Sequence, residues 1–515
     1  MRIGTNVAAI VANNALQKSQ NNLSTSIERL SSGYKINGSK DDAAGCAISE
    51  KMRGQIRGLS QAQNNTADGV SVLNTAEGAI TEIQSMLTRL KELSVQAAND
   101  VNSDDEREAI QKEIEQINNE IDRISDQTEF NTQSLINGNL SRRVYSDLQG
   151  VNQLSVSDSY TVGVYGITVT EDARQAIAIG AGSITMSSTA SITEEQAGAI
   201  NINGYKISIS EGDTLDKVMG KIIDGVNITG GSAFTVKDLN NDTAANGTDY
   251  AGYVPTADYA GSTLVIMTNQ YGSDQKMNIT CDNAELADIL GIPQAATQDG
   301  IYVEGSDVKA EIATGDDGKR IGFADSAILS TKGTVITVTD VNNKEFSMDV
   351  PGNAAGTVFD DSNNDGQSVA GAGTARTISQ EVTDVGTMSI HVGANQDQVI
   401  VIDIPAITTY SLGTEHMNVM TQYTASRAIS TVDEAINKTN KIRSRIGAYE
   451  NRFDHTTNNL EVSSENLTKS LSTMIDTDMS EEMTTYTSET VLTQAATSIL
   501  AQANERPSQV LQLLQ

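Results

Sequence analysis

The sequence predicts an α+β protein in which a long, coiled-coil-like helical bundle from both ends of the chain carries an inserted β-rich segment. The first proline is Pro255 and none lies between Pro405 and Pro507, so both ends can form long helices. Apolar residues recur at helical spacings in both end regions, whereas β-branched residues alternate between about 141 and 386. The 515 residues exceed what one core can hold, and roughly three or four domains are expected.

Apolar spacings of three and four residues predict two antiparallel helices in the N-terminal part. One apolar seam runs through residues 73–97 and the next through residues 110–124. Between them, Ser103 and Glu106 have the spacing of a capping box, in which each side chain bonds the backbone of the other residue at a helix start. We therefore expect the second helix to begin just after Ser103.

A seven-residue repeat predicts a further long helix near the C-terminus. The repeat consists of Ile446, Phe453, Leu460, Leu467 and Met474. Sustained heptads of this kind are typical of helices that pack against other helices as in a coiled coil.

Both extreme ends of the chain carry weaker apolar stripes. A single amphipathic helix is marginal in water and is stabilised mainly by packing its apolar face. Each end therefore needs a partner, which is either the other end or another molecule. The residues expected to pack in this way are Leu16, Leu23, Ile27 and Leu30 at the start, and Ile499, Val510, Leu511, Leu513 and Leu514 at the end.

The central segment, 141–386, predicts one or two small β-rich domains. Residues 199–209 form one expected hairpin, which turns at Asn203-Gly204, and residues 334–350 form another. A short capped helix is expected at 213–218. An insert of this kind separates the two helical ends in the sequence but leaves them together in space.

Composition excludes several classes of function. Lys and Arg number 35 against 67 Asp and Glu, a formal charge of −32 that argues against binding to nucleic acid or to anionic membranes. No apolar run approaches the roughly 18 residues of a membrane helix, and the run at 7–12 is too short for a cleavable signal peptide. Cys46 and Cys281 are too few and too far apart for a disulfide framework, and Cys46 is expected to be a small buried residue.

No motif predicts an enzyme, a cofactor or a metal site. The three histidines, His391, His416 and His455, lie outside any H-E-x-x-H pattern, and no CxxC or nucleotide-binding loop occurs. Residues 361–366 match the first half of a calcium loop. Ala372 stands where the bidentate Glu is needed, so a solvated acidic loop is favoured.

Segments at both ends resemble bacterial flagellins. Residues 26–37 and 41–53 are similar to the start of that family, and residues 500–514 are similar to its C-terminus. Asn451-Arg452-Phe453 and Asn466-Leu467 also fit. The resemblance covers about 1–140 and 387–515, on both sides of the insert.

The resemblance implies a subunit that polymerises into the extracellular flagellar filament for motility. It also implies export through the flagellar type III apparatus, and partners comprising an export chaperone, hook–filament junction and filament cap proteins, and other copies of the chain. Residues 387–395 are similar to a V-G-A-N strand that elsewhere follows the second helix closely, so the insertion point here is unusual. The implied layers are 1–44 and 466–515 for D0, 45–140 and 387–465 for D1, and 141–386 for the outer domains.

The resemblance also implies a receptor site. Residues 87–96 are similar to the D1 segment recognised by Toll-like receptor 5. Arg89, Leu93 and Gln96 are spaced to share one helix face, expected to be exposed in the free monomer, and Glu113 matches the acidic partner on the next helix. The alternative is that this face is merely solvated or packs against another subunit.

Three other functions remain open. A hook–filament junction protein would have similar helical ends. A flagellin with a metallopeptidase outer domain is disfavoured by the missing H-E-x-x-H, and an adhesive outer domain is neither supported nor excluded. For the filament subunit, the charge of −32 predicts that salt strengthens assembly by screening repulsion between copies.

Overall fold

The computed structural model describes residues 6–157, 160–180, 182–237, 259, 261–292, 300–315, 318–341, 344–352, 359–360, 369–370, 375–383 and 385–513. The chain forms two compact units. Unit 1 comprises residues 1–70, 390–400 and 451–515, and unit 2 comprises residues 71–389 and 401–450. Two long helices, α2 (Ala43–Ala97) and α7 (Gln422–Ile475), contribute residues to both units.

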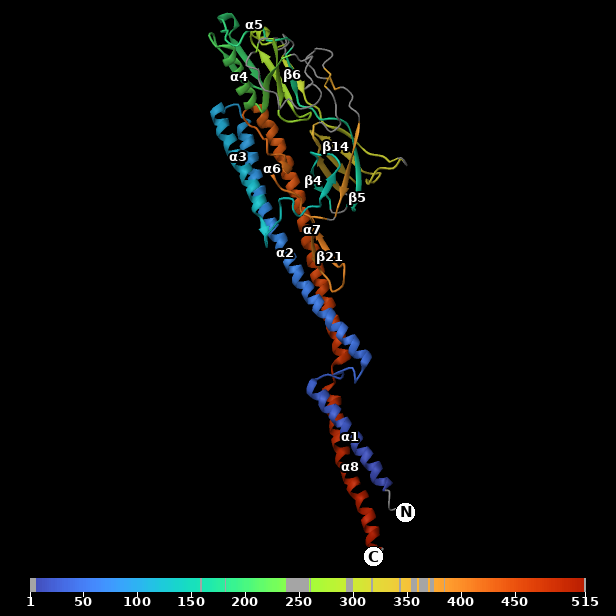
Figure 1. Cartoon of the computed structure of the whole chain (residues 1–515). Helices are drawn as coiled ribbons and strands as arrows, with labels where there is room; N and C mark the ends of the chain where they lie inside the picture. Colours follow the sequence, from blue (N-terminus) through green and yellow to red (C-terminus); the bar gives the residue numbers. More distant parts are fainter. Residues whose placement is uncertain are drawn as a thin grey trace. The chain divides into compact units, whose positions relative to one another are not determined.

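Unit 1 contains α1 (Val7–Ser32) and α8 (Met479–Leu513), which lie side by side and antiparallel (Figure 1). Asn22 Nδ2 donates a hydrogen bond to Glu489 Oε1 at 2.9 Å, and Arg29 Nη1 lies 3.6 Å from Glu482 Oε2. Helix α1 ends at Gly33, whose φ of 75° closes the helix in a left-handed conformation that favours glycine. The two chain ends therefore supply partners to one another.

The rest of unit 1 packs the first part of α2 against the second part of α7. Leu59 and Ala62 of α2 form a buried cluster with Leu460 of α7. Phe453 is fully buried, and a Cβ on Gly69 would lie only 3.0 Å from its ring, so glycine permits this close approach. The burial of Phe453 and Leu460 confirms that the heptad repeat marks a packed helix.

In the helical part of unit 2, α2 contacts both α3 (Asp104–Gln127) and α7. The predicted seam of α2 is confirmed, because Leu73, Ile80, Leu87 and Leu90 are completely buried. Lys91 Nζ lies 2.6 Å from Asp433 Oδ1 on α7. The capping box at the start of α3 and the antiparallel course of α2 and α3 are also confirmed. A short helix, α6 (Thr409–Leu412), packs beside α3.

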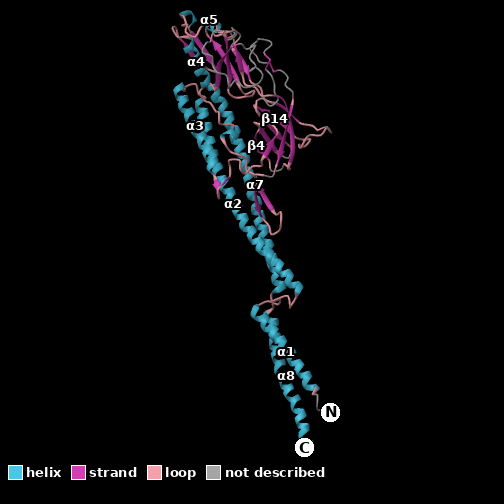
Figure 2. Ribbon diagram, in the orientation of Figure 1, coloured by secondary structure: helices cyan, strands magenta, loops and turns pink. Residues whose placement is uncertain are grey.

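The described strands pair antiparallel in seven sheets (Figure 2). Most lie between residues 144 and 382, inside the segment predicted to be β-rich. The strands are β1 (Glu129–Phe130), β2 (Gln133–Ser134), β3 (Val144–Ser146), β4 (Asn152–Val156), β5 (Gly163–Glu171), β6 (Ile177–Ile179), β7 (Gly198–Ile202), β8 (Tyr205–Ile209), β9 (Gly231–Lys237), β10 (Ser262–Thr268), β11 (Lys276–Cys281), β12 (Ile301–Glu304), β13 (Lys309–Ile312), β14 (Ile328–Lys332), β15 (Val335–Thr339), β16 (Glu345–Asp349), β17 (Phe359–Asp360), β18 (Val369–Ala370), β19 (Arg376–Val382), β20 (Met388–His391) and β21 (Val399–Ile402).

The first β-rich core joins the sheets β12-β11-β7-β8 and β6-β10-β9 with two helices, α4 (Leu215–Ile228) and α5 (Ala284–Ile289), and a 3₁₀ turn, Glu194–Gln196. The hairpin predicted at 199–209 is confirmed, and its turn residues have φ values of 49° and 90°. Helix α4 begins at the cap Thr214 and runs ten residues past the predicted end at 218, because its apolar face stays buried through Val226.

The second β-rich core lies between the sheets β13-β5-β19-β3 and β14-β15-β16-β4. Tyr160, Tyr165, Phe323 and Phe346 meet there with ring centroids 5.0–6.1 Å apart. The hairpin predicted at 334–350 is confirmed as β15 and β16. The half calcium loop at 361–366 lies outside the described residues, and the division of the chain into five segments stays a prediction.

One prediction about burial is wrong. Cys46 is partly exposed rather than buried. Both cysteines are free thiols. Its neighbour Gly45 takes the covered position at the start of α2, where a Cβ would lie 2.7 Å from Ile36 Cδ1. A small residue is therefore needed at 45, one position before the cysteine.

Candidate assembly surface

The seam between α1 and α8 buries few side chains. Ala12, Leu16 and Ser26 of α1 are buried, as is Ala503 of α8. Asn6 joins the two helices, because it caps α1 by accepting from Ala9 N–H and donates from Nδ2 to the Ala503 carbonyl at 2.9 Å. Such a seam holds the pair together but covers little of the apolar surface on either helix.

The predicted packing residues divide into two groups. Leu16 is 9% exposed and lies in the seam, and Leu23 and Leu30 are partly buried. Ile27 is 50% exposed and Ile499 is 56% exposed, so the partner helix does not cover them. The side chains of Val510, Leu511 and Leu513, and the whole of Leu514, lie outside the described residues.

Seven further large apolar side chains of the pair are also about half exposed. All lie on α1 or α8 in unit 1, with exposed fractions of 49–64%. They are Val7, Ile10 and Val11 on α1 and Met479, Met483, Val491 and Leu492 on α8. A shallow groove of about 520 Å³ runs along α8 between Met483 and Leu492. Exposed apolar side chains gathered along a groove are typical of a site of association.

Three of the four residues expected to contact the receptor, Arg89, Gln96 and Glu113, are exposed on α2 and α3 of unit 2. Arg89 Nη2 lies 2.8 Å from Glu113 Oε1 across the α2–α3 pair, and both side chains are about half exposed. The hydrogen bonds that Arg89 donates to Glu113 and then to Glu92 raise the pKa of Arg89, which keeps its charge fixed. Gln96 is also exposed.

The expected exposure of Leu93 is wrong, because that side chain is only 1% exposed. Helix α2 packs against both α3 and α7, which widens its apolar face beyond the single seam that the spacing indicated. The exposed apolar residue of this segment is Val95, which is 52% exposed and borders a shallow groove of about 470 Å³ with Thr88, Glu92 and Gln96. The sequence signal that could have pointed to Val95 is its position directly before Gln96.

The described residues contain no group of three or more His, Cys, Asp or Glu side chains placed to hold a metal ion. Among the described helices, none combines the length and the apolarity needed to cross a bilayer.

Comparisons with known proteins agree at both ends of the chain. The bacterial flagellin N-terminal helical region matches residues 3–141, and the bacterial flagellin C-terminal helical region matches residues 429–514. The flagellin of Salmonella typhimurium is 31% identical, with 99% of each chain covered. Polar flagellin A of Vibrio parahaemolyticus is 29% identical over 100% of this chain and 99% of its own. The flagellin of Clostridium tyrobutyricum is 29% identical over 96% and 98%.

Among solved structures, FliC from Burkholderia pseudomallei covers 75% of this chain and 99% of its own at 13% identity, with a TM-score of 0.22. The hook-associated protein-3 from Legionella pneumophila covers 82% and 98% at 13% identity, with a TM-score of 0.28. Scores this low do not separate a filament subunit from a junction protein. Full-length similarity to flagellins is the finding that does.

Proposed function

This chain belongs to the bacterial flagellin family and is a subunit of the flagellar filament, and we propose that the exposed apolar surface of α1 and α8 makes the contacts of its polymer. The observation that supports this proposal is the half-exposure of nine large apolar side chains on the two helices of unit 1. Burying apolar surface is the dominant favourable term in most protein association. The alternative of a junction protein is less supported, because the curated relatives that match over the full length are flagellins.

Charge sets the conditions for assembly. Each copy carries a formal charge of −32, so neighbouring subunits repel one another at low ionic strength. Added salt screens this repulsion and leaves apolar contact to drive polymerisation. The amount of polymer at a given protein concentration should therefore rise with salt.

The test is seeded polymerisation of the purified chain. Short filament fragments are added to monomer at low salt, at about 0.15 M and at about 0.5 M salt, ionic strengths that screen charges to different distances. Sedimentation gives the polymer fraction, and electron microscopy identifies filaments. Filaments that become more abundant with salt support the proposal. A monomer that never joins the seeds contradicts it, and polymerisation insensitive to salt contradicts the role of charge.

We also propose that Arg89, Gln96 and Glu113 contact Toll-like receptor 5 in the free monomer, with Val95 as the apolar neighbour. The support is geometric, since these side chains are exposed on adjacent faces of α2 and α3. An Arg anchor beside an exposed aliphatic group is common among residues that dominate binding energy. Leu93 is not included, because replacing a buried leucine would disturb helix packing instead of testing a contact.

The receptor proposal is tested with the double variant Arg89→Ala, Gln96→Ala. Binding of the monomer to the receptor ectodomain should weaken about 30-fold, which corresponds to roughly 2 kcal/mol, the threshold of an interface hot spot. Arg123→Ala is the matched control, because Arg123 is equally exposed on α3 and also pairs with a glutamate on its own helix. Unchanged binding of the double variant would rule the site out.

The remaining assignments follow from family membership and are part of the same proposal. The filament places the chain outside the cell, and we propose that it arrives as unfolded chain through the flagellar type III apparatus. An export chaperone and the junction and cap proteins are its proposed partners during that route. We propose a structural role without catalysis, which a protease assay with and without a chelator would test.

A further inference from the structure

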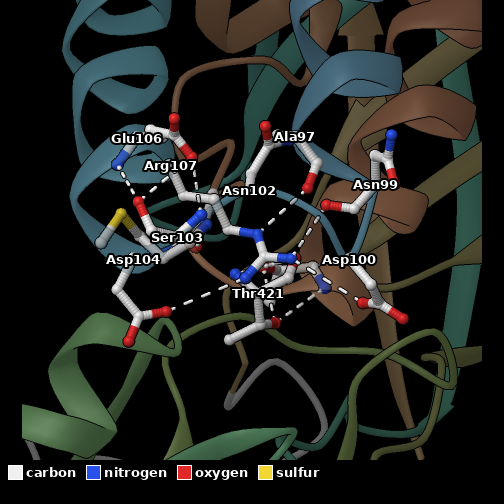
Figure 3. A network of polar contacts seen from close by, with 12 residues as sticks. Ala97, Asn99, Asp100, Asn102, Ser103, Asp104, Glu106, Arg107 and Thr421 are labelled. Carbon is white, nitrogen blue, oxygen red and sulfur yellow. Dashed lines mark hydrogen bonds and ion pairs between the residues drawn. The ribbon is translucent and has the colours of Figure 1, made fainter.

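A polar cavity of about 410 Å³ lies in unit 2. Its walls come from the turn between α2 and α3, the turn between β7 and β8, strands β11 and β12, and the start of α7. Figure 3 shows the helical wall, where the Arg107 guanidinium lies among carbonyl and carboxylate oxygens of the α2–α3 turn. The volume falls in the range of pockets that hold small ligands.

The helical wall is held rigidly by Arg107, which is 9% exposed. Its Nε donates to the Ala97 carbonyl at 3.1 Å, and its Nη2 donates to the Asn99 carbonyl at 3.2 Å. The capping box of Ser103 and Glu106 fixes the same turn. These bonds use the hydrogen-bond donors of the guanidinium within the protein. Arg107 therefore holds the wall in place and is not a ligand-binding group.

The sheet wall is tied together through Asn203. Its backbone N–H donates to the Asn278 carbonyl at 2.9 Å, and its side-chain oxygen accepts from Asn278 N–H at 2.8 Å. On the neighbouring strand, the Tyr302 hydroxyl donates to Glu304 at 2.7 Å. The same glutamate pairs with Lys276 and raises the pKa of that lysine. The lysine therefore stays protonated, and the carboxylate balances its positive charge at the cavity.

The third wall is the first turn of α7. Thr421 N–H donates to Thr424 Oγ1 at 3.0 Å, and Thr424 N–H donates to Thr421 Oγ1 at 3.1 Å. This reciprocal pair holds Tyr423, which also lines the cavity, at the helix start. All three walls are therefore ordered without a ligand, which lowers the entropic cost of binding one.

The lining chemistry narrows the class of ligand. The two cations that line the cavity, Arg107 and Lys276, already have anionic partners, so a phosphate or carboxylate gains little there. Asp100 and Asp104 lie 3.8 Å from the guanidinium, beyond hydrogen-bond distance, and are mostly exposed. Their oxygens can accept bonds from hydroxyl groups of a ligand.

Tyrosine rings complete the lining. Tyr205, Tyr302 and Tyr423 reach the cavity from three different elements. An aromatic face packs well against an apolar ring face, and a tyrosine also offers a hydroxyl at its edge. Aromatic faces, carboxylate acceptors and side-chain amides together match a compound with ring C–H faces and many hydroxyl groups. We propose that this cavity binds a neutral mono- or disaccharide.

The test uses the full-length monomer and four neutral sugars: maltose, lactose, cellobiose and di-N-acetylchitobiose. Saturation-transfer NMR detects binding, and titration gives the affinity. At least one sugar should bind with a dissociation constant on the order of 1 mM or tighter, an affinity typical of a small polar ligand in a shallow site. Failure of all four sugars to bind at about 20 mM, well above that constant, overturns the proposal.

Two variants locate the binding. Tyr302→Ala removes a ring face and Asp104→Asn removes a charged acceptor while keeping its shape, and each should weaken binding about tenfold. Tyr145→Ala is the matched control, because Tyr145 is 55% exposed on β3 outside the cavity and Tyr302 is 52% exposed. A sugar that binds the Tyr302→Ala and Asp104→Asn chains as tightly as the unaltered one overturns the site. Displacement of the sugar by inorganic phosphate would also contradict the proposal that the cavity prefers a neutral ligand.

Discussion

Replacing Val491, Leu492 and Ile499 of α8 with alanine should block assembly while leaving the monomer folded. The three side chains are 59%, 50% and 56% exposed, so about half of their apolar surface is available for contact with a partner. Alanine is the strongest helix former, so the helix itself is not weakened by the change. The variant therefore separates contact between subunits from folding within one subunit.

The magnitude follows from the carbons removed. Val→Ala removes two carbons and each of the other changes removes three, and each carbon is worth about 0.8 kcal/mol when fully buried. Since only the exposed half of each side chain is available to a neighbour, the loss is about 3 kcal/mol per subunit. That loss corresponds to a rise of roughly a hundredfold in the critical concentration for polymerisation.

The assay is sedimentation of seeded polymer over a series of monomer concentrations, with circular dichroism to confirm unchanged helix content. Ile328→Ala is the control, because Ile328 is 70% exposed on β14 in the β-rich part of the chain. It should polymerise like the unaltered chain. The reasoning is refuted if the triple variant polymerises within about threefold of the unaltered critical concentration, a difference below 1 kcal/mol.

Two further predictions concern stability. Phe453→Ala empties a fully buried position and should lower the free energy of unfolding by about 3–5 kcal/mol, measured by urea denaturation, whereas Val462→Ala, at a 57% exposed position of the same helix, should change it little. Hydrogen bonds from Lys217 and then Lys221 lower the pKa of Asp213 from 3.8, so its stabilising contribution is present above pH 3.8 and is lost as pH falls through the lowered value. Asp213→Asn should weaken the protein at pH 6 and flatten this acid dependence. Identical urea midpoints for the two chains from pH 6 to pH 2.5 would contradict the second prediction.

Local patterns predicted the helices and two hairpins well. The apolar spacing of α2, the Ser103–Glu106 capping box and the Asn203-Gly204 turn depend on residues within a few positions of one another. Backbone geometry at that range follows from residue type, because spacing sets a helix face and a turn needs residues that tolerate positive φ. The same local signals could not show how far α4 extends, since its last turns are stabilised by burial against the β-rich core.

The candidate sites were predicted less completely. Arg89 and Glu113 lie together as the resemblance implied, but Leu93 is buried because α2 contacts two helices and not one. Helical spacing places a residue on a face but does not say how many neighbours cover that face. The saccharide cavity has no signal in the sequence, because its lining comes from positions between 100 and 423.

The sequence by itself determined that both ends of this chain are helices with apolar stripes in need of a partner, because helical periodicity is a local property. Only the tertiary structure decided which of these apolar residues the partner helix covers and which it leaves exposed. The antiparallel pairing of α1 and α8 buries Leu16 yet leaves Ile27 and Ile499 half exposed. Two helices in contact can cover only the sides that face each other, so the remaining apolar surface stays exposed in the single chain, and we propose that other copies of the chain cover it.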